Sequence, residues 1–96
     1  MSYPNAKVVT YPAYRFIVKA AADGYDYDLT ADYAQLSRAI SQGVPGNIVV
    51  DMVNTDGTVT NVTIPGGDYP SGYTFLVQVS KVYDTGTTAD SIIIYL

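Results

Sequence analysis

The alternation of apolar and polar side chains predicts a series of short strands. Residues 7–20 form the first, because from Tyr14 to Lys19 successive side chains fall on opposite faces of an extended chain. Pro12 has no amide proton to donate to a neighbouring strand. We therefore expect this strand to lie at a sheet edge or to break at Pro12.

A hairpin is the clearest local prediction. Two β-branched segments, residues 48–53 and 59–64, are separated by a short stretch that contains Asp56-Gly57. Asp-Gly between such segments favours a tight turn with positive φ, so we expect the chain to reverse there. We expect Ile48, Val50 and Met52 to share one face of the first strand, and Thr60, Val62 and Ile64 to share one face of its partner.

Residues 73–82 read as one further strand, with Phe75, Val77 and Val79 pointing inward. Residues 30–42 permit two interpretations. Thr30 could cap a short helix that runs to Ala39. Alternatively, the segment is a strand with Leu36, Arg38 and Ile40 on one face and Ser37 and Ala39 on the other.

Strands of this length, separated by turns rich in Gly and Pro, predict an all-β fold. We expect a small antiparallel β-sandwich or open barrel, with at most one short helix near residues 31–40. We divide the chain into an N-terminal arm or edge-strand segment, residues 1–27, and a β-sandwich domain, residues 28–96. A chain of 96 residues buries roughly 65% of its unfolded surface, so no covalent staple is needed.

Composition narrows the chemistry by exclusion. The chain has no Cys, His, Trp or Glu, which removes disulfides, thiolate zinc sites, the usual general base and the commonest metal ligand. A formal charge of −4 argues against nucleic-acid binding. No apolar run approaches the roughly 18 residues of a membrane span, and no charged-then-apolar leader precedes the chain. We expect a mature, non-secreted, soluble protein.

Aspartates supply two candidate sites. Asp23, Asp26 and Asp28 lie in one loop and could hold calcium, although a solvated turn is the stronger interpretation. Asp84 and Asp90 flank Thr-Gly-Thr-Thr-Ala and could hold that loop through its backbone amides. We find no arrangement of a nucleophile, base or oxyanion donor. The sequence therefore predicts no enzyme, no catalytic residue, no cofactor and no metal.

Ten tyrosines stand against two phenylalanines. Tyrosine suits half-buried strand positions, but it is also enriched at protein–protein contacts. We take Tyr3, Tyr11 and Tyr14 of the N-terminal segment as candidate contact residues.

The last strand is apolar on both faces. Ile92, Ile94 and Leu96 fall on one face, and Ile93 and Tyr95 fall on the other. A strand with two apolar faces is covered on both. A neighbouring subunit could cover Ile93 and Tyr95, or the strand could lie at the centre of its own domain.

Three segments carry a family resemblance. They are the lead-in from Arg38 to Asn47, the hairpin that ends at Ile64 to Gly67, and the ending from Val82 to Ile92 with Thr-Gly-Thr-Thr-Ala inside it. Together, over roughly two-thirds of the chain, they resemble the spike base proteins of tailed-phage heads and gene transfer agents. The N-terminal 27 residues do not match that pattern and could form an added edge strand, a capsid-contacting arm or a receptor for another virion protein.

The resemblance implies a structural virion protein, a cyclic homo-oligomer on the capsid surface, at the vertices. Its partners would be the major capsid protein and a spike or fibre protein, with no nucleic acid and no membrane. A capsid cement or decoration protein is a related possibility. A small carbohydrate-binding β-module, in which exposed tyrosines stack on sugars, is the alternative from another class.

Overall fold

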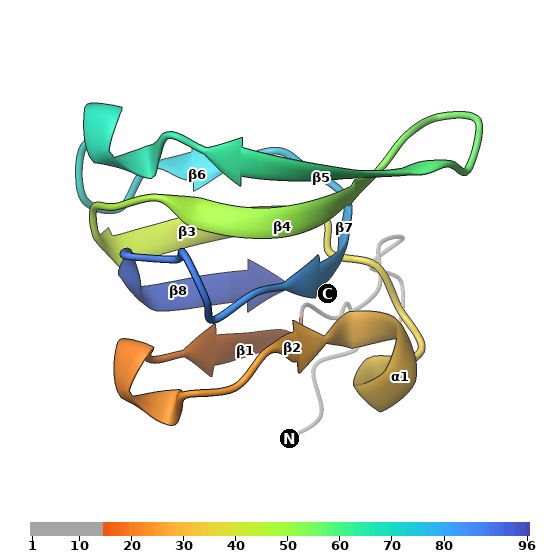
Figure 1. Ribbon diagram of the computed structural model, residues 1–96, viewed down its shortest axis with the longest axis horizontal. Coiled ribbons are helices and arrows are strands. Elements are labelled where there is room, and N and C mark those ends of the chain that lie inside the picture. Colours follow the sequence, from red (N-terminus) through yellow and green to blue (C-terminus); the bar gives the residue numbers. More distant parts are fainter. Residues whose placement is uncertain (1–14) are drawn as a thin grey trace, which may run out of the picture.

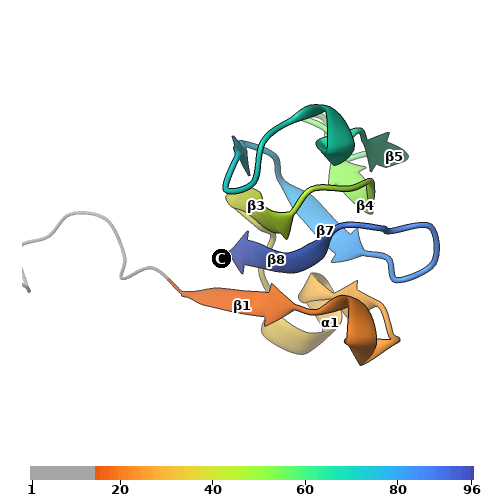
Figure 2. The same cartoon turned by 90° about the vertical axis from the view of Figure 1, so that its left-hand side faces the viewer.

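Two antiparallel four-stranded sheets face one another in the computed structural model, which describes residues 15–96 (Figures 1 and 2). The β8 sheet has the order β1 (Phe16–Lys19), β8 (Asp90–Tyr95), β3 (Ala39–Val44), β6 (Thr74–Phe75). The β4 sheet has the order β2 (Tyr27–Asp28), β7 (Val79–Val82), β4 (Ile48–Val53), β5 (Val59–Ile64). The all-β sandwich predicted from the sequence is confirmed.

In the described part of the chain, three short helices connect strands at the ends of the sandwich. They are η2 (Ala21–Asp23), α1 (Leu29–Tyr33) and η3 (Gly66–Asp68). Helix α1 packs against β7 and buries Leu29 completely (Figure 1).

The core is built from rows of side chains that the strand register places side by side. In the β8 sheet, Ile94 lies opposite Ile17 of β1 and Ile40 of β3, and Ile40 lies opposite Phe75 of β6. Ile40 and Ile94 are fully buried. Burying an isoleucine side chain contributes about 1.5–3 kcal/mol, so rows of this kind supply most of the stability of a small sandwich.

The shared faces of the predicted hairpin are confirmed, and they turn toward the core, although Thr60 at the end of this row is exposed. Ile48 pairs with Ile64, and Val50 pairs with Val62, both along the core side of the β4 sheet. The turn differs in type from the expected two-residue form. Asn54 and Thr58 close a three-residue loop, and only Gly57 within it has positive φ, at 86°. This is the three-residue hairpin in which a left-handed residue follows a type I turn.

Replacing Gly57 with valine should lower the free energy of unfolding by about 1–2 kcal/mol, because a β-branched residue resists the left-handed region. A Cβ at this position meets nothing within 4 Å, so backbone strain alone causes the effect. Urea unfolding measures it, and Gly57→Asn should cost less because asparagine tolerates positive φ. Equal stabilities for the two variants would contradict this explanation.

The single strand predicted over residues 73–82 is wrong. It is two strands in different sheets, β6 and β7, joined by a crossing at residues 76–78. Ser37 fixes that crossing, since its hydroxyl donates to the Val77 carbonyl and accepts from the Val79 amide. Phe75 and Val77 are nevertheless partly buried against the core and Val79 is fully buried, as the inward pattern predicts.

The helix predicted near residues 31–40 is shorter and lies earlier. Asp28 rather than Thr30 is its cap, because the Asp28 carboxylate accepts from the Ala31 amide at 3.1 Å. The helix ends at Tyr33, where Ala34 takes a left-handed conformation. The strand interpretation holds only from Ala39 onward.

Candidate interface

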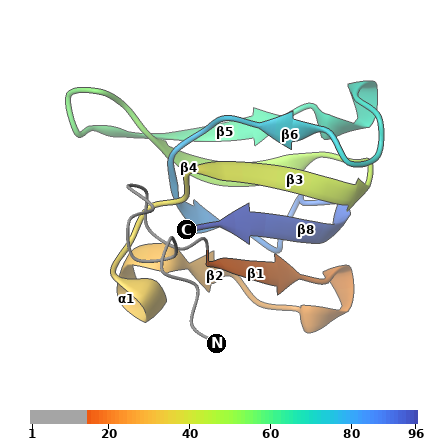
Figure 3. The same cartoon turned by 180° about the vertical axis from the view of Figure 1, so that it is seen from behind.

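The outer side of the β8 sheet, which is turned toward the viewer in Figure 3, carries apolar side chains. One row across it contains Phe16, Tyr95 and Ala39, and the next contains Val18, Ile93, Ser41 and Thr74. We call these residues together with Leu76 the outer face. Phe16 is 58% exposed, Val18 49% and Leu76 85%. Large apolar side chains gathered on one sheet face mark a surface that meets another molecule.

Tyr95 covers the middle of the outer face. Its hydroxyl lies 3.4 Å from the Ser41 Oγ, and its ring lies 6.4 Å from that of Phe16. This position explains why Ala39 and Ser41 are buried although they point outward. The face is therefore a continuous surface rather than a set of isolated side chains.

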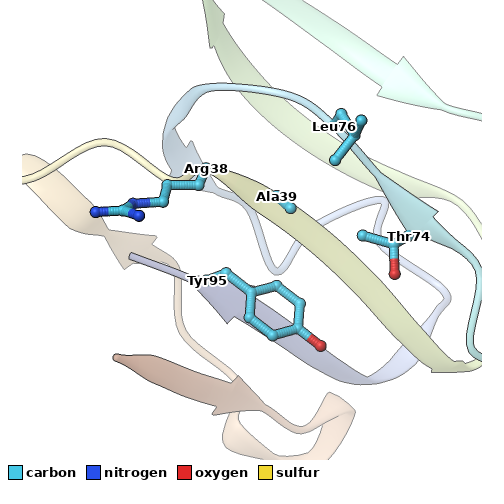
Figure 4. A pocket seen from close by; sticks show the side chains of 5 residues that line it. All are labelled: Arg38, Ala39, Thr74, Leu76 and Tyr95. Atoms are coloured by element: carbon cyan, nitrogen blue, oxygen red, sulfur yellow. The ribbon is translucent and has the colours of Figure 1, made fainter. Parts of the chain in front are cut away.

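A shallow hollow of about 310 Å³ lies on the same face (Figure 4). Ala39 forms its floor between Leu76 and Tyr95, with Thr74 and Arg38 at its rim. The lining contains no carboxylate, no metal-ligating pair and no nucleophile beside a base. This hollow can receive an apolar side chain.

The outer side of the β4 sheet is mixed: Val59 lies there 55% exposed, paired with the half-buried Val53, beside a row of polar side chains. One row across it contains Asp28, Lys81, Asp51 and Asn61. Asp51 accepts from the Tyr83 hydroxyl at 2.8 Å, which raises the pKa of Tyr83, and from the Asn61 amide at 3.1 Å. Antiparallel sheets commonly pack one side on the core and hydrate the other. The β4 sheet follows this rule along the row through Asp51, and the β8 sheet departs from it.

The predicted contact residues fall in two groups. Ile93 and Tyr95 lie on the outer face, half-buried, while Ile92, Ile94 and Leu96 are buried on the core side. Tyr3, Tyr11 and Tyr14 lie outside the described residues. Phe16 and Val18 join the outer face through the pairing of β1 with β8, and Leu76 joins it as part of the lining of the hollow.

The three segments that carry the family resemblance meet at one end of the sandwich. Gln42, buried in β3, donates through Nε2 to the Gly66 carbonyl at 2.6 Å and accepts from the Gly46 amide at 3.3 Å. A Cβ at Gly46 would collide with the backbone of Ala89, and one at Gly66 would collide with the Gln42 side chain. These glycines are needed for close packing of three loops.

Threonines, not the flanking aspartates, hold the Thr-Gly-Thr-Thr-Ala loop. Thr88 Oγ1 accepts from the Asn47 amide at 2.8 Å, and Thr87 Oγ1 accepts from the Val49 amide at 3.0 Å. The Asp84 carboxylate instead binds Lys19. Thr87 and Thr88 therefore join the loop to the start of β4. The sequence analysis did not predict this role for the two threonines.

Asp90 does bind backbone amides, as expected, but outside that loop. Its carboxylate accepts from the amides of Ala21 and Ser91, each at 2.7 Å, and these bonds hold its pKa below the ordinary value. A lowered carboxyl pKa stabilises the fold above the unfolded pKa, and the contribution disappears as pH falls through the folded value. Asp90 thus ties η2 to β8 at neutral pH.

The carboxylates of the Asp-rich loop, residues 23–28, accept hydrogen bonds from other groups of the protein. Asp23 accepts from the Tyr27 hydroxyl at 2.7 Å and from the Ala20 amide at 2.9 Å, and both bonds lower its pKa. Asp26 accepts from the Asp84 amide at 2.7 Å. Asp28 caps α1. In residues 15–96 no three acidic side chains converge in a way that could bind a metal.

Exposed tyrosines pack against other rings. Tyr69 lies 4.6 Å from Tyr73 between ring centroids, and both contact Phe75. Tyr25 stacks on Tyr27 at 5.2 Å. These contacts give the tyrosines a packing role within the domain.

Comparison with known proteins found no matching family model, curated protein or solved structure. Within residues 15–96, no helix has the length and apolar character needed to cross a bilayer.

Proposed function

We propose that this chain is a structural virion protein of a tailed phage, seated on the capsid surface as the base for a head spike or fibre. The outer face is the contact with another protein subunit of the particle, and the major capsid protein is the partner we favour. The chain acts by binding and carries no catalytic group. A capsid cement or decoration protein, the related alternative, would bind the capsid through the same outer face.

One observation carries the proposal: the outer sides of the two sheets differ in composition. The β8 sheet and the adjoining crossing present Phe16, Val18 and Leu76 to solvent, whereas the β4 sheet presents a row of charged and amide side chains with Val59 exposed at its edge. Such asymmetry suits a subunit attached on one side and hydrated on the other. The resemblance in the three loop segments supports the virion assignment.

The test uses Ile93→Asp in virions. An aspartate at Ile93 stays hydrated on the free protein but loses its water at the contact, which is strongly unfavourable for a carboxylate. We expect the wild-type chain to sediment with purified particles and the variant to remain in the unbound fraction, at least tenfold depleted from particles. Immunoblotting of density-gradient fractions measures this.

A matched control is Thr55→Asp, which adds the same charge at an exposed position in the loop between β4 and β5 of the other sheet. It should be incorporated like the wild type. Absence of the wild-type chain from particles would overturn the virion proposal. Equal incorporation of Ile93→Asp would leave the virion role intact and remove the outer face from it.

A further inference from the structure

Within residues 15–96 the two sheets have four edge strands, and three of them are protected against pairing with another chain. Strands β2 and β6 have two residues each. Strand β1 turns a charged side chain inward, since Lys19 is 1% exposed and binds Asp84. Very short edges and inward charges are the devices by which proteins block edge-to-edge pairing.

Strand β5 has none of these devices. It is six residues long, pairs with β4 at six consecutive positions without a bulge, and lies last in its sheet (Figure 1). Residues 57–67 contain no charged side chain. A long, regular, uncharged edge is a template for another strand.

The hydrogen bonds of the hairpin show which groups β5 presents at that edge. The Asn54 amide donates to the Thr58 carbonyl, and bonded pairs alternate along an antiparallel ladder. Strand β5 therefore turns the N–H and C=O groups of Val59, Asn61 and Thr63 away from β4. The same parity appears on β4, where the Val53 amide and Val49 carbonyl bond on the β7 side.

We propose that β5 pairs antiparallel with β5 of a second copy of this chain. The two-fold axis that relates the copies passes between their two Asn61 residues. Asn61 then faces Asn61 of the second copy, and Val59 faces Thr63. Each of these three pairs exchanges two backbone bonds, about six in all, so every outward group of β5 is satisfied. A shift of the register by two residues toward the C-terminal end of β5 would place Val59 opposite Pro65, which has no N–H to donate.

Charge does not oppose this pairing. The nearest carboxylate across the sheet is Asp51, which lies beside Asn61 on β4. Two Asp51 residues would be three strand spacings apart, about 14 Å, beyond the screening length of about 8 Å at physiological salt. The result is one continuous eight-stranded sheet and the smallest cyclic oligomer.

This dimer does not depend on the virion role, and Ile93→Asp should leave it intact. The test is a single cysteine in a chain that otherwise has none. Asn61→Cys places two sulfurs across the axis, where Cα atoms about 5.5 Å apart fit a disulfide. Under mild oxidation we expect a covalent dimer on non-reducing electrophoresis, formed at least tenfold faster than with Thr63→Cys, whose copies lie about 14 Å apart. Equal rates, or no dimer from Asn61→Cys, would overturn the pairing.

A charge pair tests the register without a covalent bond. Val59→Lys with Thr63→Lys sets like charges opposite each other twice, whereas Val59→Lys with Thr63→Asp sets opposite charges there. Light scattering over a concentration series should show the first variant monomeric and the second dimeric, with dissociation constants at least about tenfold apart. Identical masses in two folded variants, checked by circular dichroism, would contradict this register.

Discussion

Replacing Ile94 with aspartate should leave the domain unfolded at 25 °C. Ile94 is fully buried between Ile17 of β1 and Ile40 of β3. Losing its side chain costs about 2–5 kcal/mol, and an unpaired buried carboxylate costs several more. That sum matches the lower end of the 5–15 kcal/mol of a typical domain, which is where a small sandwich lies. Circular dichroism should show neither strand signal nor a cooperative thermal transition.

The neighbouring residue supplies the control. Ile93 lies on the outer face and is half-buried, so Ile93→Asp should retain the strand signal and a cooperative transition. The two variants differ by one position on the same strand and by the side of the sheet that carries the charge. If both unfold, a layer of the domain covers Ile93, and the outer face is not an interface.

Local signals predicted those elements whose cause is local. The 48–64 hairpin follows from Asp56-Gly57 between two β-branched strands, and its inward faces follow from a period of two. The two sides of β8 follow in the same way from residues 92–96. The turn type was missed because Asp56 does not adopt the positive φ that a two-residue turn would need.

Non-local contacts caused the errors. Residues 73–82 alternate without interruption, so nothing in that segment indicates that the chain leaves one sheet for the other. The crossing depends on Ser37, which lies far away in the sequence and bonds the backbone of Val77 and Val79. A serine before an apolar strand gives no sign of such a role.

Only the β8 part of the candidate interface was predicted, because the rest depends on contacts that are far apart in the sequence. Ile93 and Tyr95 follow from the alternation of one strand. Phe16 and Val18 also fall on one face of their own strand, but which sheet face that is depends on the pairing of β1 with β8. Such a pairing of the first described strand with the last could not be read from either segment alone.

Removing Asp84 should destabilise the domain by about 3 kcal/mol. Lys19 is buried at the end of β1, and its ammonium lies 3.0 Å from the Asp84 carboxylate and 5.5 Å from the Tyr27 ring. Asp84→Ala leaves that ammonium inside the protein without its carboxylate, which is the costly way to break a buried pair. We use the lower end of the usual range because the Asp84 side chain is 32% exposed. Urea unfolding gives the value.

Lys19→Met should cost less, about 1 kcal/mol or nothing, since it removes the buried charge and keeps a side chain of similar length. The double variant should then resemble Lys19→Met alone, because Asp84 has no buried ammonium left to neutralise. Lys81→Met provides the exposed comparison: its pair with Asp26 spans 3.7 Å at the surface, and its loss should change stability by at most about 1 kcal/mol. A Lys19→Met variant less stable than Asp84→Ala would show that the packing of the lysine chain, rather than neutralisation of its charge, holds β1 to the β7–β8 loop.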